Sequence, residues 1–233
     1  MSASLAVHLV VGTLALVAYW AALASRKGSA RHRWLGRTFF VAMLAVVASV
    51  APLLLGSTPV DPGHVVQLVY LSVCVATVVT LGWTAVRWRR EPERFHGAHL
   101  RPLGGLLSGL GALVLFAGLG TGDPVPVVLS WVGLAYGSAM WRSSRGTGAW
   151  PRGWWLCWHL DAIAGLFTAV HGTVAYVTWR ELVMPGAGPW WAALAHAGVL
   201  VLAVGFRAWA AGHYRAPSVV FVVPGRVVRP SPA

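Results

Sequence analysis

The chain has 233 residues, of which 57% are hydrophobic and 10% are Asp, Glu, Lys or Arg, whereas about 25% of a soluble domain is charged. A soluble fold of this size could not cover its surface with so few charges, so we expect a bilayer to be its solvent. The net charge of +12 would suggest nucleic acid in a soluble protein. Here the basic residues lie in short loops between apolar runs, which argues against a nucleic-acid partner and indicates membrane orientation.

Seven apolar runs of the sequence are long enough to cross the hydrocarbon, which is about 30 Å thick and needs about 20 helical residues. The sequence therefore predicts an all-α, polytopic membrane bundle of seven transmembrane helices over residues 1–213. A disordered or surface-lying cytoplasmic tail, residues 214–233, would follow it. The fourth and fifth runs are short and rich in glycine, and Asp123-Pro124 marks the turn between them. The predicted spans are 4–25, 38–57, 64–86, 103–121, 125–141, 154–179 and 189–210.

The basic residues predict how the bundle is oriented. Of the 18 Lys and Arg residues, 17 lie at or after the ends of the first, third, fifth and seventh spans, and only Arg180 lies on the other side. Asp61, Asp123 and Glu181 lie in the opposite loops. Because basic loops stay in the cytoplasm, we expect the N-terminus outside, the C-terminus in the cytoplasm and a location in the inner membrane.

Tryptophans gather near both predicted boundaries, where their rings suit the headgroup region. We interpret them as interfacial belts, and the alternative is a tryptophan box that stacks on a ligand. The inner belt is Trp34, Trp88, Trp141, Trp150, Trp154, Trp155 and Trp158, and the outer belt is Trp179, Trp190 and Trp191.

Small residues predict which spans pack together, since they let membrane helices approach closely. Gly105 and Gly109 form a GxxxG pair in the fourth span, and Gly133 and Gly137 form another in the fifth. We therefore expect these two spans to pack as an antiparallel pair. The two cysteines of the chain lie in distant spans and are expected to be buried, unpaired thiols.

Ionisable residues inside a membrane are costly, so each is a candidate for function. From the helical rise, His8, His171 and His196 lie about 6, 12 and 10 Å below the outer boundary, on three different spans. Imidazoles that converge from several helices bind a metal ion or a haem iron. The sequence thus predicts an outer site for haem b or a metal at these residues. The alternative is that each histidine hydrogen-bonds to a neighbouring helix.

His159 and His32 are candidates for a second, inner haem site. His159 precedes His171 by twelve residues, about 18 Å along one helix. That distance would place one ligand at each of two stacked sites.

Asp161 is the one acidic residue within a predicted span. A carboxylate at that depth needs a partner, and the candidates are the arginines of the first cytoplasmic loop and Arg207 at the inner end of the seventh span. The alternatives for Asp161 are a structural ion pair and a proton relay.

The first fifty residues contain His8-x3-Gly12, Lys27-Gly28-Ser29, His32-Arg33-x2-Gly36-Arg37 and Ala42-Met43. Together with Trp155-x3-His159 in the sixth span, this pattern resembles the family called domain of unknown function 2306, which are predicted bacterial multi-span membrane proteins. The resemblance covers the first two spans and part of the sixth. It implies a bacterial membrane protein and directs attention to the first cytoplasmic loop.

Lys27, Arg33 and Arg37 in that loop are candidates for binding an anion or a lipid headgroup, and the alternative is that they only fix topology. We interpret His96 and His99 in the next inner loop as loop surface. The sequence has no GxGxxG, P-loop, HExxH or GxSxG motif, so it indicates no catalytic residue.

Three candidate functions remain. The first is electron transfer through an intramembrane haem b or metal bound by the histidines. The second is a non-enzymatic membrane protein that binds a lipid, a small solute, a partner protein or a second copy of itself. The third is a proton-coupled transporter centred on Asp161 and His171.

Overall fold

The structure is a computed structural model, and it describes residues 2–56, 62–146, 149–186 and 188–217. Every regular element in these ranges is a helix, which confirms the all-α class. Six of the described helices are long and apolar enough to cross a membrane, so the chain has the character of a multi-pass membrane protein. They are α1 (Ala3–Ala24), α2 (Ala30–Leu55), α3 (Pro62–Arg87), α5 (Leu100–Thr121), α8 (Trp154–Thr178) with its π-helical end η1 (Trp179–Val183), and α9 (Pro189–His213).

The predicted fifth span, 125–141, is divided into α6 (Pro124–Leu129) and α7 (Trp131–Ser143). The hydroxyl of Ser130, between the two helices, donates to Val127 O at 2.7 Å, and such bonds of serine to the preceding turn bend helices. Backbone bonds from Ser130 N to Pro126 O and from Leu134 N to Ser130 O still bridge the bend. Neither helix alone has the length of a span, so the seventh crossing stays a prediction.

The start of α2 differs from the prediction by eight residues, because the span was expected to begin at residue 38 and the helix begins at Ala30. Ser29 caps this helix: its side-chain oxygen accepts from His32 N at 3.1 Å, which satisfies one of the free backbone donors of the first turn. Arg33 and Arg37 therefore lie on a helix that extends beyond the apolar run.

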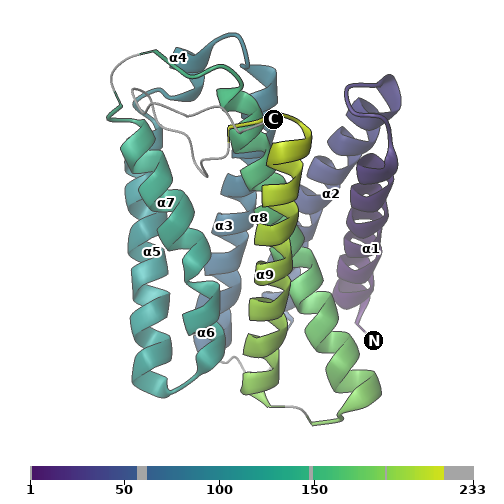
Figure 1. The fold of residues 1–233 in the computed structure, drawn as a ribbon. Coiled ribbons are helices and arrows are strands. Elements are labelled where there is room, and N and C mark those ends of the chain that lie inside the picture. The colour runs from purple at the N-terminus through teal and green to yellow at the C-terminus, as the bar shows by residue number, and fades with distance from the viewer. Residues whose placement is uncertain (1, 57–61, 147–148, 187, 218–233) are drawn as a thin grey trace. The chain divides into compact units, whose positions relative to one another are not determined.

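Contacts group the chain into two units, residues 1–79 and 80–233, which we describe separately. In the first unit α1 and α2 lie side by side and antiparallel, joined by a short turn (Figure 1). Small residues of α1, including Ala15 and Ala18, are buried, and the Tyr19 ring meets the edge of Phe39 at 5.2 Å.

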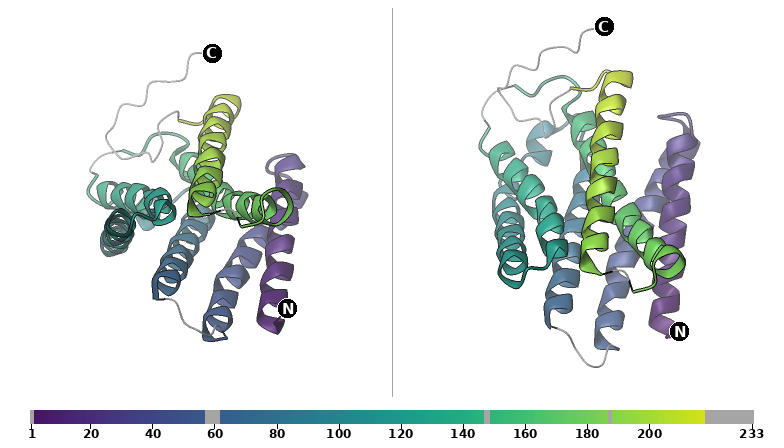
Figure 2. Two further views of the ribbon diagram at one scale, coloured as in Figure 1. Left: turned by 90° about the horizontal axis from the view of Figure 1, so that it is seen from below. Right: turned by 60° about the horizontal axis from the view of Figure 1, so that its bottom comes forward.

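In the second unit α5 runs antiparallel to α6 and α7, and α8 runs antiparallel to α9 (Figures 1 and 2). The short helix α4 (Pro92–Phe95) precedes α5. The predicted antiparallel pairing of the fourth and fifth runs is therefore confirmed. Ala216 and Pro217, at the start of the predicted tail, are buried, and residues 218–233 lie outside the described residues.

The predicted Gly133 and Gly137 of α7 do lie against α5, but the glycines on the α5 side of the contact are not the ones predicted. An added Cβ at Gly105 or Gly109 would meet nothing within 4 Å, whereas one at Gly104 would lie 2.7 Å from Gly137 O. The glycines on the contact face of α5 are Gly104, Gly111 and Gly118. They are spaced by seven residues, which keeps one side of a helix against its neighbour along the whole length. A four-residue GxxxG pattern does not detect this repeat.

Candidate functional site

An ion pair lies inside the second unit, between α8 and α9. Arg207 Nε donates to Asp161 Oδ1 at 2.7 Å, and the two residues are only 5% and 3% exposed. Arg207 was one of the predicted partners of Asp161, and that prediction is confirmed. Pairing offsets the large penalty of moving two charges out of water.

Neighbouring polar groups complete the surroundings of the pair. Arg207 Nη2 donates to Cys157 Sγ at 3.0 Å, and the Cys157 thiol is 3.8 Å from Asp161 Oδ2. Arg207 Nη1 donates to Pro217 O at 3.5 Å, so the chain that follows α9 also contacts the guanidinium. The Tyr136 hydroxyl of α7 donates to the backbone oxygen of Asp161. The pair thus connects α7, α8, α9 and the segment after α9.

A cavity of about 140 Å³ lies beside this pair. Asp161, Arg207, Tyr136 and Thr168 form its polar part, and its apolar walls include Trp131, Leu200 and Val204. A small ligand with an apolar body and one polar group would match this lining. Gly165 makes room for the arrangement, because an added Cβ there would overlap the Tyr136 hydroxyl.

The predicted outer histidines lie in both units. In the first unit His8 Nδ1 is hydrogen-bonded to Ser49 Oγ of α2 at 2.8 Å, which is the predicted alternative to ligand binding. In the second unit His171 Nδ1 donates to Phe167 O at 3.0 Å and His196 Nδ1 donates to Ala192 O at 2.8 Å. Within each unit, no group of three or more His, Cys, Asp or Glu of the described residues could hold a metal ion.

His171 and His196 lie at a similar level of the bundle. The His196 ring packs on Gly172, the residue after His171, and an added Cβ on Gly172 would lie 2.6 Å from His196 Cδ2. The cavity beside the ion pair is lined by neither histidine. The meeting of His8 with these two residues stays a prediction.

The predicted inner histidines contact backbone oxygens. His159 Nδ1 donates to Gly82 O of α3 at 3.2 Å, away from the ion pair of its near neighbour Asp161. In the first unit His32 Nδ1 donates to Ala22 O at 3.0 Å.

Two of the predicted anion-binding residues are used by the chain itself. Lys27 Nζ donates to Ala22 O at 3.3 Å and to Leu23 O, which are carbonyls at the end of α1. Arg33 Nη1 donates to Gly28 O, and Arg37 is exposed. Partial burial lowers the pKa of Lys27 from its ordinary value. Lys27 thus stabilises the helix end, as lysines near a C-terminus do.

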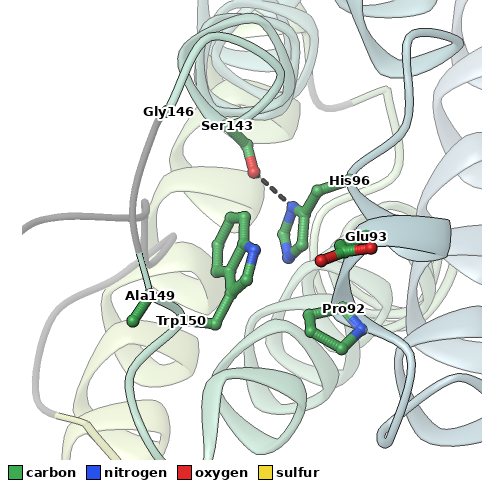
Figure 3. A pocket seen from close by; sticks show the side chains of 7 residues that line it. All are labelled: Pro92, Glu93, His96, Ser143, Gly146, Ala149 and Trp150. Carbon is green, nitrogen blue, oxygen red and sulfur yellow. Dashed lines mark hydrogen bonds between the residues drawn. The ribbon is translucent and has the colours of Figure 1, made fainter.

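His96 was interpreted as loop surface, and this was wrong. It is 8% exposed, and its ring stacks on Trp150 at 3.4 Å and lies close to Trp154, at 4.9 Å. His96 Nδ1 is hydrogen-bonded to Ser143 Oγ at 2.5 Å (Figure 3). Burial, with a smaller contribution from His99, lowers the pKa of His96 to about 3. His99 is exposed, as predicted.

Two tryptophans of the predicted inner belt also belong to this buried cluster, and the belt itself stays a prediction. Trp154 is 4% exposed and Trp158 is fully buried, and both pack on Phe95. The aromatic residues that were predicted to anchor the protein in the headgroup region therefore enclose a histidine. The signal available in the sequence was the spacing of Trp154 and Trp158, which puts them on one side of α8, whereas Trp150 lies before that helix.

Fold and site together define a multi-pass, all-helical membrane protein with a buried arginine–aspartate pair beside a small cavity. No protein-family model, curated protein or solved structure matches the chain.

Proposed function

We propose that the chain is a non-enzymatic, multi-pass protein of the bacterial cytoplasmic membrane that binds a lipid or small solute in the cavity beside Asp161 and Arg207. The observation that carries this proposal is the position of a buried ion pair in the wall of a mostly apolar cavity. The resemblance of the first two helices to the domain of unknown function 2306 family supports the bacterial membrane assignment.

The energetics of the pair favour a role beyond stability. An apolar pair of similar volume often stabilises a protein as well as a buried ion pair does. Ionisable residues deep in a membrane are costly and are therefore candidates for ligand or ion sites. Asp161 and Arg207 place a carboxylate and a guanidinium in the cavity wall, and Leu200 and Val204 offer a ligand an apolar wall.

The experiment compares two variants of adjacent residues on α9. Leu200→Trp fills the cavity wall, whereas Val201→Trp adds the same ring to a residue that is 71% exposed. The protein is purified in mild detergent and bound molecules are detected by native mass spectrometry. We expect a bound molecule on the wild type and on Val201→Trp, and its loss from Leu200→Trp. Equal retention by both variants would contradict the proposal.

The proposed topology has seven crossings, with 124–143 as the fifth, the N-terminus outside and the C-terminus in the cytoplasm. Residues 124–143 would reach about 30 Å as a helix, which is the thickness of the hydrocarbon. The backbone bonds across Ser130 support treating α6 and α7 as one bent span.

A haem or metal site at His171 and His196 is the second candidate. Their Nδ1 atoms each donate to a backbone carbonyl, which orients the other ring nitrogen as histidine ligands require. An absorption spectrum of the oxidised and reduced protein, expressed with haem supplied, tests it. A Soret band that is lost in His171→Ala would favour this candidate, and a colourless, metal-free protein would remove it.

A further inference from the structure

A second cavity, of about 480 Å³, lies where α4 meets the end of α7 and the start of α8, away from the ion pair (Figure 3). Cavities of roughly 300–1,000 Å³ are typical of small-molecule sites. Its lining includes Pro92 and Glu93 from α4, His96, and Ser143 at the end of α7. Trp150 closes one side.

The imidazole in this cavity has one nitrogen without a partner. Among the residues that the structure describes, His96 Nε2 is buried and makes no hydrogen bond. Leaving a buried polar atom unpaired costs about 1–3 kcal/mol. Ser143 fixes the orientation of the ring through its bond to Nδ1, and Trp150 packs on the ring face.

The charges around the cavity favour one class of ligand. Glu93 is the only charged side chain among its described lining residues, and no Lys or Arg of the described lining could hold an anion. Of the three arginines directly next to lining residues in the sequence, Arg142 is exposed and the other two are engaged elsewhere. Arg94 pairs with Glu91 at 3.3 Å, and Arg145 lies over the Trp141 ring at 4.1 Å.

We propose that this cavity binds a small organic cation with N–H donors, such as an amine, amidine or guanidine, and that Glu93 and His96 Nε2 are its acceptors. Nε2 accepts when the imidazole proton is on Nδ1 and is donated to Ser143 Oγ. A carboxylate and a neutral imidazole then both line the cavity. The aromatic wall at Trp150 also favours a cation. This proposal is independent of the cavity beside Asp161.

The test uses three ligands of one shape and different charge. Benzamidine presents two N–H groups and a positive charge, benzamide is neutral and benzoate is an anion. Binding of each to the full chain in detergent is measured by isothermal titration calorimetry. We expect benzamidine to bind, benzamide to bind at least tenfold more weakly and benzoate not to bind. Benzoate or benzamide that binds as well as benzamidine, or absence of benzamidine binding at millimolar concentrations, would overturn the proposal.

Two acidic residues of one segment supply matched variants. Glu93 lines the cavity, whereas Glu91, two residues earlier, pairs with Arg94. Glu93 is exposed, and solvent screening weakens exposed charge pairs. Glu93→Gln should therefore lose about threefold to fivefold in benzamidine affinity, with Glu91→Gln unchanged. His96→Phe, which keeps the stacking, should lose affinity as well. If His96→Phe does not fold, the two glutamate variants decide, and an equal affinity of both overturns the proposal.

Discussion

Arg207 Nε reaches Asp161 Oδ1 at 2.7 Å across the contact of α9 with α8, and both side chains are buried. Removing either partner leaves an uncompensated buried charge, which destabilises by about 3–5 kcal/mol. Asp161→Asn and Arg207→Gln should each lower the unfolding temperature in detergent strongly, and the double variant should lose less than their sum.

The exposed pair of Arg180 and Glu181 at the end of α8 is the matched control. Its atoms are also 2.7 Å apart, but the side chains are 43% and 59% exposed, and exposed pairs contribute about 0–1 kcal/mol. Arg180→Gln should leave the unfolding temperature nearly unchanged. If the double variant loses as much unfolding temperature as the Asp161 and Arg207 single variants together, the two side chains are not coupled.

The transporter hypothesis is tested at the same aspartate. Asp161 and His171 are ten residues apart on α8, about 15 Å along the axis, so a relay between them would need further groups. If Asp161 carries protons, Asp161→Asn vesicles should lose proton flux driven by a membrane potential. Flux equal to that of the wild type, at equal protein content, would remove this hypothesis.

The close contact of α5 with α7 predicts that glycine-to-alanine substitutions change the stability of the protein very differently at different positions. Gly137→Ala would bring a Cβ to within 2.7 Å of Gly104 O, a backbone atom that cannot move aside easily. Overpacking of this kind destabilises by about 1–3 kcal/mol. Gly105→Ala adds the same methyl group to open space. Thermal unfolding of the two variants should therefore show a loss only for Gly137→Ala, and equal effects would contradict the described contact.

Acid should destabilise the second unit through His96. Its pKa in the folded protein is about 3, against an ordinary value of 6.5, so the unfolded chain binds the proton more readily between these values. The contribution of His96 to the free energy of unfolding is therefore complete above pH 6.5 and is lost as the pH falls toward 3. The free energy of unfolding falls by at most about 1.4 kcal/mol per pH unit through this one group. The unfolding temperature of His96→Phe should fall less than that of the wild type over this range. A parallel decline of both proteins would show that His96 does not contribute.

The fifth crossing is tested by reporter fusions at Gly122 and Gly146, which flank α6 and α7. If 124–143 spans the membrane, a periplasmic phosphatase should be active at Gly122 and a cytoplasmic fluorescent protein should be bright at Gly146. The same activity at both sites would leave six crossings and place both termini on one side.

Composition and hydropathy were sufficient to predict the six long apolar helices that the structure describes, because a membrane span needs only length and apolar character. The partner of Asp161 was also predictable, since a buried carboxylate must be paired and few basic residues lie near its depth. The bend at Ser130 was not, because it depends on the direction in which one hydroxyl points.

The burial of His96 could not be predicted from its own surroundings in the sequence. Pro92, Glu93 and Arg94 indicate a short exposed helix, and the residues that enclose the ring come from more than forty positions later in the chain. Such contacts are set by the tertiary fold. The seven-residue glycine repeat is visible in the sequence, but the prediction rested on a four-residue spacing.

The row of glycines on the contact face of α5 has a consequence for how the protein is inserted into the membrane. Gly104, Gly111 and Gly118 extend along nearly the full length of α5, and the turn to α6 is only two residues long. A hairpin with so short a turn and so continuous a contact can close before the rest of the chain has been synthesised. α5, α6 and α7 would then leave the insertion machinery as one preassembled unit, and the helices α8 and α9 would add to a surface that already exists.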